Sequence, residues 1–202
     1  NNIEAGSFSE TTTASFGVDF YLGSQDDEEK AFGAVTEASD DALTFGYSLG
    51  IGLNTSFTGE DSLDITIDAG NSTEGVAEFD GNTNGDGLIV DGISYTFPVG
   101  DATFFVGDST DGSALFTTAC VYGGPGNMLD DCANVNAGIT GGAATLGASY
   151  DFGNGFTAAT GFQTDSTVAG TFTDESLDAY AFNTAYIADS YGVSLTYGIV
   201  ET

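Results

Sequence analysis

The segment DGNTNGDGLIVD, residues 80–91, carries oxygen-bearing side chains at the spacing of a calcium-binding loop. Such a loop places ligands at positions 1, 3 and 5, a glycine at position 6 and a carboxylate at position 12. The same Gly-Asp-Gly run also suits a tight turn with positive φ that needs no metal. Two interpretations are therefore open, a calcium site and a polar turn between two strands. The candidate ligands are Asp80, Asn82, Asn84, Asp86 and Asp91.

The charge balance limits what chemistry the rest of the chain can do. The 202 residues contain 31 acids and a single basic residue, Lys30, with no histidine, so the formal net charge is −30. Nothing here could neutralise phosphates, which excludes nucleic acid as a direct partner. The usual general bases and oxyanion-binding groups are absent as well, and we expect no enzyme. Self-repulsion of this size calls for strong salt or bound cations.

The two cysteines, Cys120 and Cys132, both lie in residues 107–142, a long stretch without regular alternation. Irregular segments of this length are uncommon in compact domains and are usually functional or disordered. In an oxidising compartment the cysteines would close a short loop with a disulfide, which the loop context favours. In a cytosolic protein they would be two reduced thiols.

Strands are the elements that must position these residues. Large apolar side chains alternate with Gly, Ser and Thr over long stretches, which is typical of antiparallel strands whose two faces meet different surroundings. Turn signals such as SQDDEEK (residues 24–30) and DFGNGF (151–156) separate the stretches and predict about ten strands, mostly hairpins, in a single domain spanning residues 1–202. The clearest alternation occurs in residues 43–54, 93–99, 144–152 and 191–199.

The composition of the two faces favours one class of β-protein over another. A soluble sandwich should carry charged residues opposite its apolar face, whereas here that face is Gly, Ser and Thr, with the acids mostly in turns. A transmembrane β-barrel has apolar residues toward lipid and a polar lumen, with aromatic girdles at both ends of the apolar band. Candidate girdle residues are Phe45, Tyr47 and Phe57, and Tyr150, Phe152 and Phe156. Ordinary aromatic packing in a sandwich stays open as the alternative.

Several motifs stand in the order found in one known family. LNTSFTGEDSLDITIDAGN (residues 53–71), FDGNTNGDGLIVDGISYTFPVGDATFFVGD (79–108) and LGASYDFGNGFTAATGF (146–162) resemble the β-barrel region of cyanobacterial outer-membrane porins, the carbohydrate-selective or iron-uptake group. The likeness covers roughly the central two thirds of the chain. Because the family barrel is larger than about ten strands can make, the resemblance implies that this chain forms part of a larger transmembrane barrel.

The resemblance implies a passive channel for small hydrophilic solutes or inorganic ions, set in outer-membrane lipid, and a homotrimer by analogy with porins generally. Carboxylates lining a pore attract cations and repel anions, so we expect cation preference. Where the family usually has basic residues after Ser-Phe-Thr-Gly, this chain has Glu60, Ser62, Asp64 and Thr66. The pore-lining candidates are Asp64, Asp68, Asp91 and Asp151, and Asp130 and Asp131 would add charge if residues 107–142 fold into the lumen.

A second hypothesis has similar sequence requirements. In a secreted, acidic, β-rich structural or filament-forming surface protein, strand edges would pair between subunits and acidic turns would bind calcium. The Gly/Ser/Thr face would then stack against another subunit instead of lining a channel. Dependence on detergent separates the two hypotheses, because only a porin requires it.

Overall fold

The computed structural model describes residues 11–24, 28–31, 34–38, 43–72, 81–82, 84–119, 137–165 and 176–201. These residues form an all-β structure in which every strand pairing is antiparallel. The expected all-β antiparallel class is therefore confirmed. Within the described ranges, no helix has the length and apolar character needed to cross a membrane.

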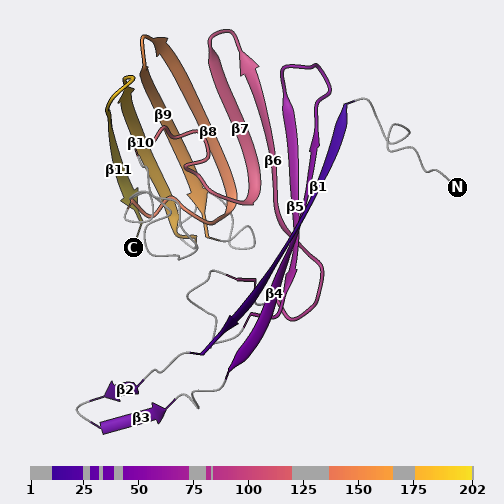
Figure 1. Ribbon diagram of the computed structural model, residues 1–202. Helices are drawn as coiled ribbons and strands as arrows, with labels where there is room; N and C mark the ends of the chain where they lie inside the picture. The colour runs from indigo at the N-terminus through magenta and orange to yellow at the C-terminus, as the bar shows by residue number, and fades with distance from the viewer. Residues whose placement is uncertain are drawn as a thin grey trace, which may run out of the picture.

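Nine of the eleven strands in the described parts of the chain form one continuous sheet (Figure 1). Within this sheet, each strand pairs with the strand that follows it in the sheet along the chain. Strand β1 therefore pairs with β4, because β2 (Glu28–Ala31) and β3 (Ala34–Ala38), which come between them in the sequence, form a separate short ribbon. The sheet is therefore a simple meander with one inserted hairpin. Its spatial order is β1 (Thr12–Gly23), β4 (Thr44–Thr55), β5 (Ser62–Gly70), β6 (Ile89–Val99), β7 (Ala102–Thr110), β8 (Gly142–Gly153), β9 (Phe156–Thr164), β10 (Asp178–Ile187) and β11 (Gly192–Val200).

The register keeps large side chains together on one face of the sheet. Phe16 of β1 lies opposite Ile51 of β4, and Ile51 lies opposite Ile67 of β5. On the other face Gly17 lies opposite Gly50. A slip of one residue would exchange the two faces of a strand, so the alternation itself specifies this register. The result is an apolar face and a glycine-rich polar face that run across the whole sheet.

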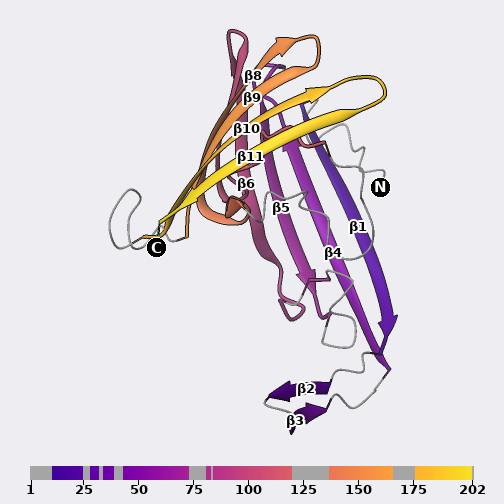
Figure 2. The ribbon, with the colours of Figure 1, turned by 90° about the vertical axis from the view of Figure 1, so that its left-hand side faces the viewer.

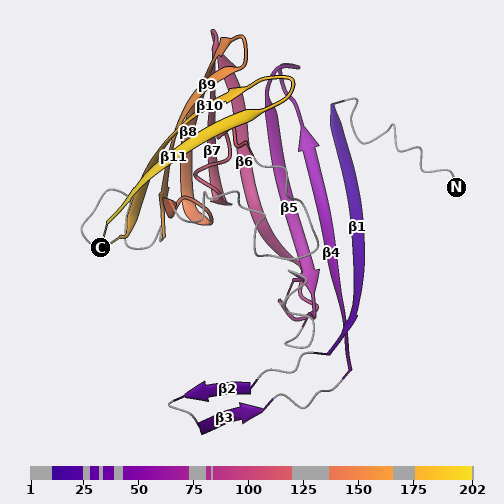
Figure 3. The same ribbon diagram turned by 60° about the vertical axis from the view of Figure 1, so that its left-hand side comes forward.

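The connections between strands are unequal at the two ends of the sheet. Residues 56–61, 100–101, 154–155 and 188–191 join successive strands at one end, which we call the short-turn end. Residues 24–43, 71–88, 111–141 and 165–177 join strands at the other, the long-loop end. In a meander, successive connections lie at alternate ends of the sheet. Short and long connections also alternate along this chain, so all the short ones lie at one end and all the long ones at the other. The β2–β3 ribbon projects from the long-loop end in Figures 1 and 3.

The sheet twists and bends into an open arc (Figures 2 and 3). Within the part of the chain that the structure describes, β1 and β11 are the edges of this arc, and each pairs with one neighbour. The nine strands do not close into a barrel. A bulge between Thr66 and Ile67 of β5 and the facing residues of β6 adds local irregularity to the arc.

Candidate functional site

The two faces of the sheet differ in chemistry and in what covers them. The apolar face exposes large side chains, with Phe16 on β1 73% exposed and Leu195 on β11 66% exposed. The polar face carries Ser48, Gly50, Gly52 and Asn54 of β4, and the residues facing them on β1 and β5 include Asp19 and Asp64. It is the polar face that receives inward-folded connections, so any site for hydrophilic solutes lies there.

One connection folds onto the polar face over β9 to β11. Its described parts, residues 111–119 and 137–141, are called the docked loop. The Gly112 amide donates to Gln163 Oε1 at 3.2 Å, and Gln163 Nε2 donates in turn to the carbonyl of Gly138 at 3.1 Å. Along the same face, the Thr117 amide donates to Asn183 Oδ1 at 3.1 Å and the Ala119 amide to Ser194 Oγ at 2.9 Å. These bonds attach the loop to three strands.

An apolar contact reinforces this attachment. Ile139 is fully buried and clusters with Ala137, Ala179 and Ala181, and Phe116 packs against the cluster. The main chain of the loop also approaches two strand glycines closely. A Cβ at Gly161 would lie 2.8 Å from the carbonyl carbon of Gly112, and a Cβ at Gly198 would lie 2.8 Å from the carbonyl carbon of Ala137. Glycine at these positions is therefore required for the loop to dock.

Asp64 and Asp68, two of the predicted pore-lining acids, both lie on the polar side of β5. Near the short-turn end, Asn54 Nδ2 donates to Asp64 Oδ1 at 2.6 Å, and Ser62 Oγ donates to Asp64 Oδ2 at 2.6 Å. Asp68 lies near the long-loop end and interacts with Asn82 and with Asp91. The polar face thus carries carboxylates at two levels along the strands.

The residues of the predicted calcium segment contact several different partners. Asp91 belongs to β6, not to a loop, and lies against Asp68. Asn84 Nδ2 donates to the main-chain oxygen of Asp68 at 3.1 Å, and its buried Oδ1 has no hydrogen-bond partner among the described residues. Asp86 instead accepts a hydrogen bond from the Tyr47 hydroxyl at 2.8 Å, and the Asn82 amide donates to Ser48 Oγ. The segment therefore directs its carboxylates to different neighbours.

No group of three or more His, Cys, Asp and Glu side chains that could hold a metal ion occurs among the residues that the structure describes. Asp80, the first residue of the calcium motif, lies outside them, as do Cys120, Cys132, Asp130 and Asp131. The calcium site, the disulfide and the charged constriction stay predictions. Asp151, the remaining pore-lining candidate, lies at the short-turn end of β8, where its Oδ1 accepts a hydrogen bond from the Gly153 amide at 2.7 Å.

The Asp61 carboxylate, which sequence reasoning missed, organises the turn at residues 56–61. Its Oδ1 accepts hydrogen bonds from Ser56 Oγ at 2.7 Å, from the Phe57 amide at 3.0 Å, and from the amide and hydroxyl of Thr58, both at 2.7 Å. Its Oδ2 accepts one from the Tyr95 hydroxyl at 2.6 Å. The bond from Tyr95, supported by those from Thr58 and Ser56, holds the pKa of Asp61 far below its usual range despite its burial.

The other residues that sequence reasoning missed are the anchors of the docked loop, Gln163, Asn183 and Ser194. Alternation assigns each of them to the polar face, but their partners are distant in sequence. Gly112 is 51 residues from Gln163, Thr117 is 66 from Asn183, and Ala119 is 75 from Ser194. No local signal predicts such pairs.

Comparison with known proteins adds no assignment. No protein-family model matches the chain, and no curated protein matches it.

Proposed function

We propose that the chain is an outer-membrane porin, a passive diffusion channel for small hydrophilic solutes or inorganic ions. Its sheet would form part of a transmembrane barrel, with the apolar face toward lipid and the polar face toward a water-filled lumen. The single observation that carries this proposal is the exposed apolar face, which extends from β1 to β11. Water-soluble monomers rarely expose contiguous apolar patches above a few hundred Å², whereas lipid requires such a face.

The unequal connections support the same placement. Outer-membrane barrels have short turns on the periplasmic side and longer loops on the extracellular side. Here all four connections at the short-turn end have six residues or fewer, and all four at the long-loop end have thirteen or more. The short-turn end would then face the periplasm and the long-loop end the exterior.

Aromatic side chains gather toward the short-turn end of the apolar face. Tyr95 stacks on Phe97 with ring centroids 5.4 Å apart, and Phe97 stacks on Phe104 at 6.0 Å. Further along the same end, Tyr150 contacts Phe152 at 4.7 Å and Phe156 contacts Tyr186 at 4.5 Å. Aromatic rings at this level of a barrel sit at the membrane–water interface, which favours the porin over the sandwich.

Charge on the polar face would set the selectivity. Asp64 and Asp68 would stand in the lumen wall, with Asp91 beside Asp68 and Asp151 at the periplasmic rim. Fixed carboxylates in a narrow pore raise the local concentration of cations and repel anions. The docked loop would occupy part of the lumen over β9 to β11 and narrow the path for solutes. We therefore propose a cation preference.

Calcium and self-association belong to the same proposal. Asp68, Asp91 and Asn84 lie near the long-loop end and offer oxygen ligands of the type that calcium prefers, and Asn84 Oδ1 has no hydrogen-bond partner among the described residues. A bound divalent ion would relieve part of the net charge of −30. Trimer formation is proposed by analogy with porins alone.

Reconstitution into a planar bilayer tests the function. Stable conductance steps, with a reversal potential in a KCl gradient that favours potassium, are the expected result. Steps that favour chloride would contradict the proposed cation selectivity but would still support a channel. Protein that stays monodisperse without detergent and passes no current would contradict the porin itself.

The open edges of the sheet favour one competing function. β1 and β11 each have one unpaired side within the described residues, and exposed edges can pair with another chain. A secreted, acidic, β-rich structural or filament-forming protein would use these edges for assembly. Fibres that grow in detergent-free buffer, with the conductance absent, would support this alternative.

A further inference from the structure

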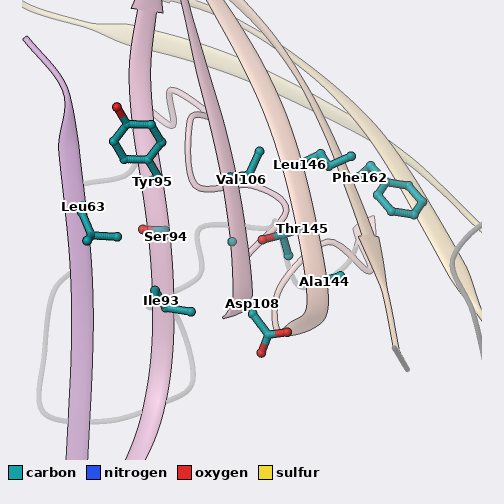
Figure 4. A pocket seen from close by; sticks show the side chains of 11 residues that line it. Leu63, Ile93, Ser94, Tyr95, Val106, Asp108, Ala144, Thr145, Leu146 and Phe162 are labelled. Atoms are coloured by element: carbon teal, nitrogen blue, oxygen red, sulfur yellow. The ribbon is translucent and has the colours of Figure 1, made fainter. Parts of the chain in front are cut away.

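The apolar face is not flat. A hollow of about 580 Å³ lies across β5 to β9, in the middle of the sheet (Figure 4). Its walls are apolar side chains contributed by all five strands. The residues that form these walls are Leu63, Ile93, Tyr95, Val106, Leu146 and Phe162.

Packing around Phe162 keeps the hollow open. Phe162 is only 7% exposed, and its ring lies 5.2 Å from that of Tyr180, which fixes it against the sheet. Val106 and Leu146 are 42% and 43% exposed at the rim. The small residue Ala144, which lies on the same side of β8 as Leu146, leaves space where a larger side chain would have filled the surface. The hollow is therefore built into the packing of the face.

The two ends of the hollow differ in polarity. Figure 4 shows the ring of Tyr95 toward one end and the carboxylate of Asp108 toward the other. Asp108 is exposed, lies on the same side of β7 as Val106, and accepts a hydrogen bond from Ser109 Oγ at 3.0 Å. It lies two residues before the long-loop end of the strand. The hollow thus suits an amphipathic ligand whose tail lies along the strands and whose polar end reaches the level of Asp108.

We propose that this hollow retains one acyl chain of a membrane lipid, an inference that rests on the proposed membrane placement. A flexible hydrocarbon chain can follow the apolar walls, and an unfilled hollow would forfeit dispersion contacts along its lining. A second copy of the chain is disfavoured as the occupant of the hollow itself, because the exposed carboxylate of Asp108 at one end would face another strongly acidic chain, so the proposed trimer would form through another part of the sheet. A lipid tail carries no such charge.

A tryptophan reporter tests the proposal, because the chain has no tryptophan of its own. Phe162→Trp places the reporter in the wall of the hollow, and Leu195→Trp places a matched reporter on the exposed face of β11. Both variants are reconstituted in vesicles of phosphatidylcholine with brominated acyl chains, which quench tryptophan on contact. The vesicles are then mixed with excess unbrominated lipid in detergent. Quenching should be lost about tenfold more slowly from Phe162→Trp than from Leu195→Trp, since every additional buried methylene strengthens the retention of the lipid in the hollow.

The variant Ala144→Phe, made in the Phe162→Trp background, fills the hollow and should remove the slow phase. Native mass spectrometry of otherwise unaltered protein, with and without Ala144→Phe, gives a second readout that does not use the reporter. One lipid should remain on the unaltered protein after delipidating detergent and be lost from the variant. Loss of quenching at equal rates from both reporters would overturn the proposal of a retained lipid without contradicting the proposed porin function. Absence of quenching from Leu195→Trp would overturn the membrane placement itself.

Discussion

Gly161→Ala should release the docked loop from the polar face of the sheet. Gly161 lies on β9 directly beneath the loop, and an added Cβ would lie 2.8 Å from the carbonyl carbon of Gly112, with the carbonyl oxygen nearer still. Ordinary van der Waals contact begins at 3.4 Å. The obstructing atoms are main chain, so they cannot turn aside as a flexible side chain would. The loop must move away from the strand.

The magnitude follows from what holds the loop. Overpacking of this kind costs about 1–3 kcal/mol. The bonds from Gly112, Thr117 and Ala119 to the sheet contribute roughly 0.5–1.5 kcal/mol each, and moving Gly112 also weakens its bond to Gln163. The cost is comparable with the polar part of the docking energy. A loss of about 1.4 kcal/mol would raise the population of undocked loop tenfold.

Two measurements follow the loop and the channel separately. Amide hydrogen exchange of Thr117 and Ala119, whose N–H groups donate to Asn183 and Ser194, should become faster in Gly161→Ala. Single-channel conductance should rise and become noisier, because the loop would no longer narrow the lumen. Gly17→Ala is the matched control. Gly17 lies on β1, on the same polar face of the sheet as Gly161, and an added Cβ there meets nothing within 4 Å.

Unchanged exchange rates in Gly161→Ala would refute the packing argument, because they would show that the loop tolerates the methyl group. Faster exchange with unaltered conductance would have a different meaning. The loop would then be docked by the contacts described but would lie outside the path of the ions.

Three further predictions concern charge. Asp61→Asn should lower the thermal midpoint of the detergent-solubilised protein above about pH 4, because a carboxylate with a depressed pKa stabilises the fold only while it is ionised. For the same reason, the midpoint of the variant should fall less steeply than that of the unaltered protein below that pH. Circular dichroism melts measure both effects, with Asp101→Asn, in the exposed turn at the same end of the sheet, as the control. The double variant Asp64→Asn and Asp68→Asn should lower the potassium-to-chloride permeability ratio several-fold in bilayer recordings, and an unchanged ratio would place both acids outside the lumen. Calcium should raise the thermal midpoint more than sodium chloride at equal ionic strength, and equal effects would indicate screening without a bound ion.

Regular alternation made most of the sheet predictable. Residues 43–54, 144–152 and 191–199 were expected as strands, and they correspond to β4, β8 and β11. Period two is a local property, so each strand reveals its two faces without knowledge of its neighbours. The polar side of β5, and with it the orientation of Asp64 and Asp68, followed from the same rule.

Features that depend on distant partners were not predictable. SQDDEEK was interpreted as a turn, yet Glu28–Ala31 forms β2 because it pairs with β3. Asp91 was expected among the pore-lining acids, although strict alternation from Ile93 would put it on the apolar side; it lies against Asp68 because the bulge in β6 breaks the alternation, and no local signal predicts that bulge. The anchors of the docked loop belong to the same class, since the closing bond from Gly112 to Gln163 spans 51 residues.

The number of strands has a consequence for any closed assembly. Eight antiparallel pairings separate β1 from β11, so the two edge strands point in the same direction. An all-antiparallel barrel that contains this sheet must therefore insert an odd number of strands between its edges. Identical copies arranged by rotation about the barrel axis would meet through parallel seams, and copies that met through antiparallel seams would have to point in opposite directions across the membrane. All-antiparallel closure in one orientation thus depends on strands that run from the long-loop end back to the short-turn end.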